Sequence, residues 1–284
     1  MTERAPAAVV DDVLDAVAAA APEIRDGLPG RRRHIDDTNP SGETVLAADD
    51  FADDLLERRL TAVDGVGAYA SEERESVVDA GDGVSVTCDP LDGSSNLKSN
   101  NPMGTVVGVY DAALPASGRD LVGAAYVLFG PVTTMGAAVD GEATEYLVDD
   151  GVRDSLGALT IPDDPTVYGF GGRVPEWPGD FAAYADAVES ELKLRYGGAM
   201  VADVAQVLTY GGVFAYPALR SAPDGKLRLL FEGAPMGYIV EAAGGRSSDG
   251  TRSLLDVDAD DLHQRVPVHL GNADLVTRLQ SRLD

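Results

Sequence analysis

Asp89-Pro90-Leu91-Asp92-Gly93-Ser94-Ser95-Asn96 is the stretch that decides the fold and the chemistry of this 284-residue chain. The residues before it, Gly83 to Cys88, have the alternating apolar pattern and the β-branched content of a strand. Pro90 has no N–H to donate, so we expect it to take the chain out of regular strand pairing. Asp89 and Asp92 then lie at a strand end, where two carboxylates can converge on a hard divalent cation.

The second half of the stretch is suited to a phosphate group. Gly93 permits close backbone approach, Ser94 and Ser95 offer hydroxyl and N–H donors, and a helix that starts here would point its positive end at an anion. The Leu91 carbonyl is a further oxygen ligand for a metal. The stretch therefore predicts a metal-assisted phosphatase site, and the alternative is a surface Asp-Gly turn with a capping serine.

A second acidic motif lies upstream. Ser71-Glu72-Glu73 follows the short apolar segment Gly67 to Ala70, which is also typical of a strand. Four carboxylates at neighbouring strand ends would repel one another and raise their own pKa values unless cations lay between them. We interpret these acids as a metal cluster, with a capping Ser-Glu-Glu on a solvated face as the alternative.

These two motifs resemble the signature of class I fructose-1,6-bisphosphatases, within the wider lithium-sensitive, inositol-monophosphatase-like phosphatases. The likeness runs from Gly42 to the C-terminus. It implies an α/β fold, an α+β layered sandwich of two fused α/β subdomains with the active site between them. Residues 1–160 would form the metal- and phosphate-binding subdomain and residues 161–284 the sugar-binding one. The likeness continues through Arg195–Val204, Tyr210–Pro217, Gly225–Glu232, Ala242–Gly245 and His263–Gly271.

The resemblance also assigns catalytic roles. It implies two or three Mg²⁺ ions, with Mn²⁺ as an alternative, that bind the phosphate and orient a water for in-line attack. Glu73 and Asp49 match the pair that activates this water, and Glu43 takes the place of an aspartate on a metal-binding loop. The implied metal ligands are Glu72, Asp89, Asp92, Glu232 and the Leu91 carbonyl, and the implied phosphate contacts are Asp92, Gly93, Ser94 and Ser95.

The sugar side of the implied site holds a second, distal phosphate, which requires cationic and hydroxyl donors away from the metals. Arg195 would reach in from a neighbouring subunit, so we expect a homo-oligomer, either a dimer or a tetramer. Where the family presents an Asn and a Tyr, the chain from Tyr168 to Arg173 lacks the amide, and Arg173 is our hypothetical substitute. The implied contacts to the sugar and its 6-phosphate are Arg195, Tyr196, Met200, Tyr216 and Lys226.

Inhibition by AMP is not expected. AMP-inhibited members of the family bind the nucleotide among N-terminal helices, with Lys, Tyr and Arg side chains behind a Gly-Thr-Gly loop. Here Ala7 to Ala21 is an alanine-rich helical stretch, and the positions that match those side chains are Gly83, Val84 and Asp111. An aspartate would repel the phosphate of a nucleotide.

The composition of the chain narrows down its expected cellular location and its binding partners. No apolar run approaches the roughly eighteen residues of a membrane span and no leader pattern begins the chain, so we expect a soluble cytoplasmic protein. The single cysteine, Cys88, excludes an internal disulfide. A formal net charge of −26 excludes nucleic acid or an anionic membrane as the main partner. Only three of the 22 basic residues are lysines, which with the acidic surplus resembles proteins of salt-loving archaea.

Strand and helix patterns alternate along the chain without linkers, so we expect a compact mixed fold. The patterns predict strands at 103–110, 122–129 and 213–216, helices at 50–60, 180–192 and 201–208, and a boundary near 162–165.

Three functions fit these observations. The leading one is Mg²⁺-dependent hydrolysis of fructose 1,6-bisphosphate to fructose 6-phosphate and phosphate, a step of gluconeogenesis. The alternative keeps the chemistry but takes sedoheptulose bisphosphate, an inositol phosphate or another small phosphate ester. A non-catalytic sugar-phosphate sensor is disfavoured, because such a protein would be expected to have lost at least one ligand acid and this chain retains them.

Overall fold

The described part of the chain forms six α-helices and two main sheets. The computed structural model describes residues 5–32, 34–40 and 44–283, without the side chains of 34–38 and 44–45. The helices are α1 (Pro6–Gly27), α2 (Ala47–Leu60), α3 (Gly179–Glu189), α4 (Met200–Tyr210), α5 (Ala234–Ala242) and α6 (Ala273–Leu283). Two short helices matter for the site, the 3₁₀ helix η2 (Ser94–Leu97) and the π-helix η5 (Leu229–Gly233).

The strands form one eight-stranded sheet, one five-stranded sheet and two small pairs. The larger sheet holds β3 (Val66–Ser71), β4 (Val78–Asp79), β5 (Val84–Asp92), β6 (Met103–Tyr110), β7 (Leu121–Phe129), β8 (Thr133–Val139), β9 (Glu142–Asp149) and β10 (Val152–Ala158). The smaller sheet holds β11 (Val167–Phe170), β12 (Lys193–Leu194), β13 (Gly212–Tyr216), β15 (Arg246–Ser248) and β17 (Val268–Gly271). The pairs are β1 (His34–Thr38) with β2 (Thr44–Leu46), and β14 (Leu227–Arg228) with β16 (Arg265–Val266).

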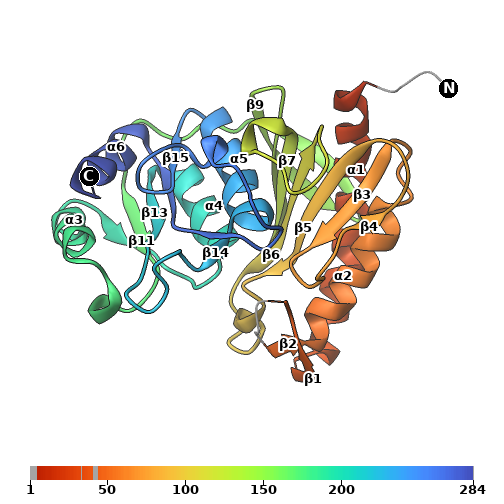
Figure 1. Cartoon of the computed structure of the whole chain (residues 1–284), viewed down its shortest axis with the longest axis horizontal. Coiled ribbons are helices and arrows are strands. Elements are labelled where there is room, and N and C mark those ends of the chain that lie inside the picture. Colours follow the sequence, from red (N-terminus) through yellow and green to blue (C-terminus); the bar gives the residue numbers. More distant parts are fainter. Residues whose placement is uncertain (1–4, 33, 41–43, 284) are drawn as a thin grey trace.

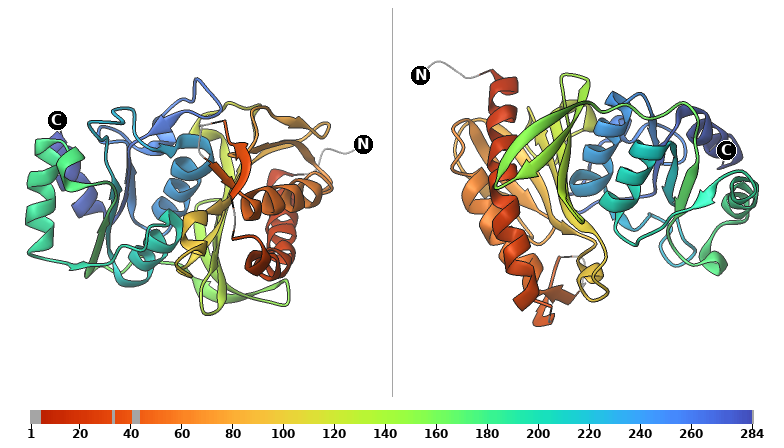
Figure 2. Two further views of the ribbon diagram at one scale, coloured as in Figure 1. Left: turned by 90° about the horizontal axis from the view of Figure 1, so that it is seen from below. Right: turned by 180° about the vertical axis from the view of Figure 1, so that it is seen from behind.

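These elements stack in five layers, as Figures 1 and 2 show. Helices α1 and α2 cover the outer face of the larger sheet, and α4 and α5 fill the space between the two sheets. Helices α3 and α6 cover the far face of the smaller sheet. The mixed α/β class predicted from the sequence is confirmed. None of the described helices combines the length and the apolar character needed to cross a bilayer.

The larger sheet has the order β10-β9-β8-β7-β6-β5-β3-β4, and only β3 and β5 in it pair in parallel. The predicted strands at 103–110 and 122–129 are confirmed as β6 and β7. The segment from β8 to β10 extends the sheet beyond what the sequence pattern indicated. Strand β10 is mostly exposed and carries little apolar alternation, so it lacks the signal on which the prediction depended.

The prediction that Pro90 ends strand pairing is wrong in part. Strand β5 continues to Asp92, and its register against β6 shifts between Asp89 and Asp92. Such a bulge accommodates a residue without an N–H inside a strand. The Thr105 hydroxyl donates to the Pro90 carbonyl at 2.9 Å and helps to hold the bulge. Asp89 and Asp92 both belong to β5 and lie at the two ends of this bulge.

The smaller sheet has the order β12-β11-β13-β17-β15 and follows the larger one in the chain after residues 159–166. The predicted strand at 213–216 is confirmed as part of β13, and the helix predicted at 201–208 as part of α4. The helix predicted at 180–192 ends earlier, at Glu189, and a turn in which Leu192 N–H donates to the Val188 carbonyl follows it.

Candidate active site

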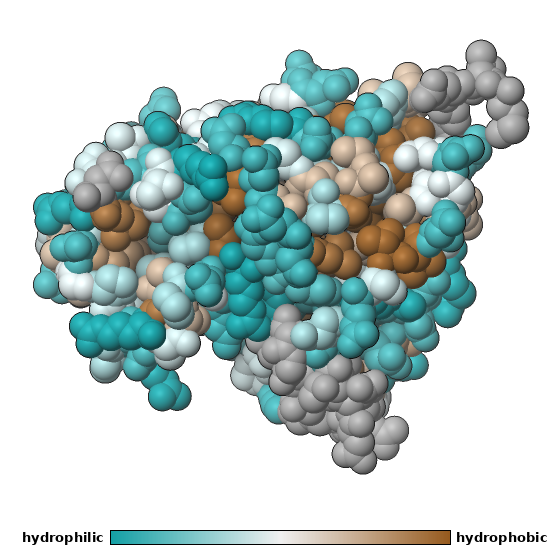
Figure 3. All heavy atoms as spheres, in the orientation of Figure 1, coloured by the Kyte–Doolittle hydropathy of each residue, from teal (hydrophilic) through white to brown (hydrophobic). Residues whose placement is uncertain are grey.

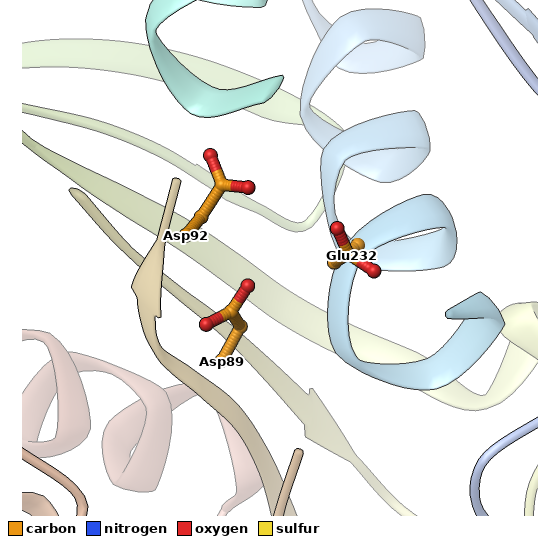
Figure 4. A group of neighbouring side chains, drawn as sticks. All are labelled: Asp89, Asp92 and Glu232. Atoms are coloured by element: carbon orange, nitrogen blue, oxygen red, sulfur yellow. The ribbon is translucent and has the colours of Figure 1, made fainter. Parts of the chain in front are cut away.

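Three buried carboxylates face one another between the two sheets. Asp89 and Asp92 leave the bulge of β5, and Glu232 approaches them from η5, as Figure 4 shows. One oxygen from each residue lies within 4.8 Å of the others. Each residue is at most 6% exposed. Three acidic oxygens at this spacing form a donor set that a hard divalent cation prefers.

Glu72 and Glu73 join this group because β3 runs parallel to β5 and ends beside it. The Glu72 N–H donates to the Cys88 carbonyl at 3.0 Å, which places the turn after β3 against β5. Arg228 forms an ion pair with Glu72, its Nη1 lying 3.1 Å from Oε1. In contrast, the Glu73 Oε2 is buried and has no hydrogen-bond partner. The predicted convergence of two acidic strand ends is present in the structure.

Glu232 owes its position to a π-helix. The wider turn of η5 is a feature that occurs frequently at functional sites. The Arg228 N–H donates to the Glu232 Oε2 at 2.6 Å. The Thr87 hydroxyl, from β5, donates to the Leu230 carbonyl at 2.9 Å. The π-helix is therefore held directly against the strand that carries the aspartates.

The glycine-serine turn follows at once, and Gly93 is required there on two counts. Its φ is +74°, and a Cβ at this position would lie 2.2 Å from the Cβ of Ala199. Ser94 and Ser95 begin η2, so their N–H groups belong to its first turn and have no earlier intrahelical carbonyl. The Asp92 Oδ2 accepts from the Val201 N–H at 2.6 Å at the start of α4. The turn thus lies where the two halves of the chain meet.

Burial sets the protonation behaviour of these acids. It raises the pKa values of Asp89 and Glu232 well above their usual range, and the nearby Glu72 carboxylate raises both further. Burial also raises the pKa of Glu73 to about 8, with repulsion from Glu72 second. The pKa of Asp92 rises to about 7 through burial, although the Val201 N–H lowers it. A cation among these oxygens would reverse the shifts, because it stabilises the ionised forms.

Asp49 lies in the first turn of α2, on the same cavity. Its Oδ2 accepts from the Leu46 N–H at 2.7 Å, which fixes the carboxylate at the start of the helix. Burial raises its pKa to about 6, against the lowering effect of that hydrogen bond. Glu43 lies outside the described residues.

A cavity of about 430 Å³ brings the predicted residues together. Carboxylates line it together with Tyr196, Tyr216 and Lys226. Figure 3 shows hydrophilic residues gathered between the two halves on one face of the molecule. The lining residues are Asn39, Asp49, Glu72, Glu73, Asp89, Leu91, Asp92, Gly93, Ser94, Ser95, Tyr196, Gly198, Tyr216, Lys226, Leu227, Arg228 and Glu232.

Two predicted contacts do not line the cavity of their own chain. Met200 is buried at the start of α4. Arg195 is exposed, with its guanidinium 5.1 Å from the ring centroid of Tyr210 and a hydrogen bond of 3.1 Å to Gln206. The hypothetical substitute Arg173 is also exposed and outside the lining.

The structure adds residues that the sequence interpretation did not single out. Arg228 is 3% exposed and lies on the cavity, where it contacts Glu72 and Glu232. Asp203 is 2% exposed and its carboxylate accepts from the N–H groups of Gly197 and Gly198 at 2.6 and 3.2 Å. Burial raises the pKa of Asp203 to about 6, against these two hydrogen bonds. Arg228 pairs with Glu72, which is distant in the sequence, and Asp203 binds N–H groups of a loop. In the sequence, the one sign of either role is a charged residue in an otherwise apolar segment.

Clustered carboxylates beside a glycine-serine phosphate turn, between two layered sheets, define a phosphatase site. Comparison with known proteins narrows the class. The model of the fructose-1-6-bisphosphatase N-terminal domain matches residues 34–157, and that of the C-terminal domain matches residues 161–284. The chain therefore belongs to the fructose-1,6-bisphosphatase family and is an enzyme of that family.

Individual relatives agree with the family models. The chain is 59% identical over 278 residues to the class 1 fructose-1,6-bisphosphatase of Natronomonas pharaonis, covering 96% of this chain and 98% of the relative. It is 58% identical over 279 residues to that of Halobacterium salinarum, covering 97% of both chains. A solved structure of Leishmania major fructose-1,6-bisphosphatase in holo form matches with a TM-score of 0.90 at 27% identity, covering 98% of this chain and 94% of that one.

Proposed function

We propose that this enzyme hydrolyses the 1-phosphate of fructose 1,6-bisphosphate with the help of two or three Mg²⁺ ions. The observation that carries the proposal is the composition of the cavity. Buried carboxylates, the Gly-Ser-Ser turn, two tyrosines and a lysine line the same cavity. A substrate with two phosphates matches that composition, because metal-binding acids and cationic and hydroxyl donors are both present.

The donor set fits divalent cations. Asp89, Asp92 and Glu232 offer oxygens within 4.8 Å of one another, and Glu72 with the Leu91 carbonyl would complete the ligands. Burial is the largest cause of the raised pKa values among these acids, and without a cation their mutual repulsion adds to it. When bound, the ions would neutralise the phosphate and lower the pKa of a water.

The side chains around the ligands have separate tasks. Glu73 and Asp49 form the pair that activates the attacking water, and the unpartnered, buried Oε2 of Glu73 is the acceptor for the proton that this water loses. The N–H groups of Ser94 and Ser95 bind phosphate oxygens at the start of η2. Arg228 holds Glu72 in place through their ion pair.

Tyr196, Tyr216 and Lys226 hold the 6-phosphate in this proposal. Replacing Lys226 by Met should raise the KM for the bisphosphate about 10- to 100-fold, because a charge-assisted hydrogen bond is lost. Turnover of fructose 1-phosphate should change little, since that substrate has no distal phosphate. Equal effects on both substrates would remove Lys226 from this role.

Phosphate release tests the proposed activity directly. Fructose 1,6-bisphosphate, sedoheptulose 1,7-bisphosphate, fructose 1-phosphate and inositol 1-phosphate are compared with Mg²⁺ in molar KCl. Preference for fructose 1,6-bisphosphate supports the proposal, and preference for sedoheptulose bisphosphate moves the substrate within the same mechanism. Equal or better turnover of the monophosphates would assign the enzyme a broader specificity.

We further propose a homo-oligomer in which Arg195 reaches the 6-phosphate in a neighbouring subunit. Its exposure, away from the cavity of its own chain, supports this placement. Subunits carrying Arg195→Ala and subunits carrying Glu73→Gln are unfolded, mixed and refolded together. Hybrid dimers contain one complete site, so about a quarter of wild-type activity should return at low substrate concentration. No recovery in hybrids verified by mass spectrometry would contradict the placement.

Three other properties belong to the proposal. The chain divides into subdomains 1–160 and 161–284, and the enzyme works in the cytoplasm, where the buried thiol of Cys88 stays reduced. AMP does not inhibit it. A shift of the substrate saturation curve by AMP would refute that last statement.

A further inference from the structure

Arg74 joins three elements that carry the acids of the proposed active site, although it does not line the cavity itself. It follows Glu72 and Glu73 in the turn after β3, where the Arg74 N–H donates to the Ser71 carbonyl at 3.2 Å. Its backbone is thus part of the turn that presents both glutamates. Its side chain leaves in the direction of α2.

The guanidinium binds one face of α2 through three carboxylates. Its Nε donates to the Asp53 Oδ2 at 2.6 Å, and its Nη2 lies 3.1 Å from the Asp54 Oδ1 and 2.7 Å from the Glu57 Oε2. Asp53 is the buried member, with a side chain only 6% exposed. It lies one helical turn after Asp49, so this ion pair fixes α2, and with it Asp49, relative to the turn that carries Glu73.

Asp53 also has a second buried partner. The Tyr69 hydroxyl, fully buried on β3, donates to the Asp53 Oδ1 at 2.9 Å. Both oxygens of Asp53 are therefore used, one by the strand and one by the turn that follows it. A carboxylate held from two sides has little freedom to rotate, so the spacing between α2 and β3 is closely specified.

The backbone of Arg74 reaches the third element. Its carbonyl lies 2.8 Å from the Nε2 of His263, and because a carbonyl only accepts, this nitrogen carries the proton. The His263 ring packs on Phe231, with ring centroids 5.2 Å apart. Phe231 directly precedes Glu232. The contact therefore connects the turn after β3 with the π-helix across the boundary between the two halves.

We propose that the Arg74 side chain is a positioning group that sets the spacing of Asp49 and Glu73, so that this part of the cluster is assembled before a cation binds; the Arg74 carbonyl connects the same turn to the element that carries Glu232. The inference rests on the proposed metal site. Mutual repulsion would otherwise move these carboxylates apart, and the ions would have to supply the energy to bring them together. Loss of Arg74 should consequently weaken metal binding more than it affects the sugar contacts.

Arg74→Met removes the ion pairs, and Arg74→Lys keeps the charge without the planar fork that reaches three carboxylates. Arg59→Met is the matched control, because Arg59 lies on α2 and pairs with an acid of α1, Glu23, at the surface. Binding of Mn²⁺ alone is measured by electron paramagnetic resonance in molar KCl. Thermal midpoint, half-saturating Mg²⁺ and the KM for fructose 1,6-bisphosphate are measured on the same samples.

Mn²⁺ affinity should fall about 10- to 100-fold in Arg74→Met, the size of effect typical of residues that orient metal ligands. Half-saturating Mg²⁺ should rise in proportion, while kcat at saturating Mg²⁺ and KM stay within a few-fold of wild type. The Mn²⁺ affinity of Arg74→Lys should lie between those of wild type and Arg74→Met. If Arg74→Met fails to fold, Asp53→Asn replaces it in the test and should also lower the Mn²⁺ affinity. A lower thermal midpoint with unchanged Mn²⁺ affinity would overturn the proposal for Arg74 alone. Absence of Mn²⁺ binding in the wild type would overturn the metal site as well.

Discussion

Glu73 differs from the other acids of the cluster because one of its oxygens is buried without a partner. If it accepts the proton of the attacking water, Glu73→Gln should lower kcat by about 10²- to 10⁴-fold, the usual contribution of a general base. KM and Mn²⁺ affinity should stay within a few-fold of wild type, because the amide occupies the same volume.

Glu75→Gln is the control for that substitution, since Glu75 lies two residues further along and is exposed. It should leave kcat unchanged. A Glu73→Gln enzyme that retains more than about a tenth of wild-type kcat would exclude Glu73 as the base.

Residues close together in the sequence were predictable, and those with distant partners were not. Asp89, Asp92 and the serines form a local pattern, so their joint presence in the cavity follows from eight consecutive letters. Arg228 acquires its role from Glu72, which belongs to the other half of the chain. No local pattern encodes that ion pair, because it exists only once the two sheets have packed together.

At the scale of elements, the loop before α4 depends on Asp203. Replacing Asp203 by Ala leaves the Gly197 and Gly198 N–H groups without their acceptor, which should cost about 1–3 kcal/mol in the free energy of unfolding. Tyr196 is in the same loop, so the KM for the bisphosphate should rise about 10-fold. Mn²⁺ affinity should change little, because the acids proposed as metal ligands lie on other elements.

Asp203→Asn is the graded variant, since it retains one acceptor oxygen and should show smaller effects. Urea unfolding at fixed KCl gives the stability, and steady-state kinetics gives KM. A loss of stability without any change of KM would show that Tyr196 does not depend on this loop.

Elements with strong periodicity or apolar content, such as β6 and β7, were predicted closely, and β5 was underestimated. Proline breaks a strand where its missing N–H would have to donate to the neighbouring strand. Pro90 lies in the bulge between Asp89 and Asp92, where the regular pairing is interrupted, so β5 can continue through it. The same bulge aims the two aspartates. Functional sites are where local rules are expected to fail, since the sequence there is selected for chemistry as well as for pairing.

At the scale of the whole molecule, the acidic cluster should make the metal-free protein less stable as pH rises. Burial raises the folded-state pKa of Glu73 to about 8, of Asp92 to about 7 and of Asp49 to about 6. Between the ordinary carboxyl range near pH 4 and these values, the folded chain binds more protons than the unfolded chain. The free energy of unfolding therefore decreases through this window.

Thermal unfolding in EDTA and molar KCl, from pH 5 to 8, checks this expectation. The thermal midpoint should fall with rising pH by several degrees, and saturating Mg²⁺ should flatten the dependence. Glu73→Gln should remove part of the slope. An identical slope with and without Mg²⁺ would show that the dependence arises from other groups.

A formal net charge of −26 produces strong self-repulsion, so the stability of the whole chain should depend on salt. Molar salt screens charges over about 3 Å, whereas 0.1 M salt screens them over about 10 Å. Lowering KCl from molar to about 0.1 M at saturating Mg²⁺ should therefore reduce both the thermal midpoint and kcat. Sodium chloride should restore both, because screening depends on ionic strength, and sucrose of equal osmolality should restore less. Unchanged stability and activity across this range would mean that the fold tolerates its acidic surface without screening by salt.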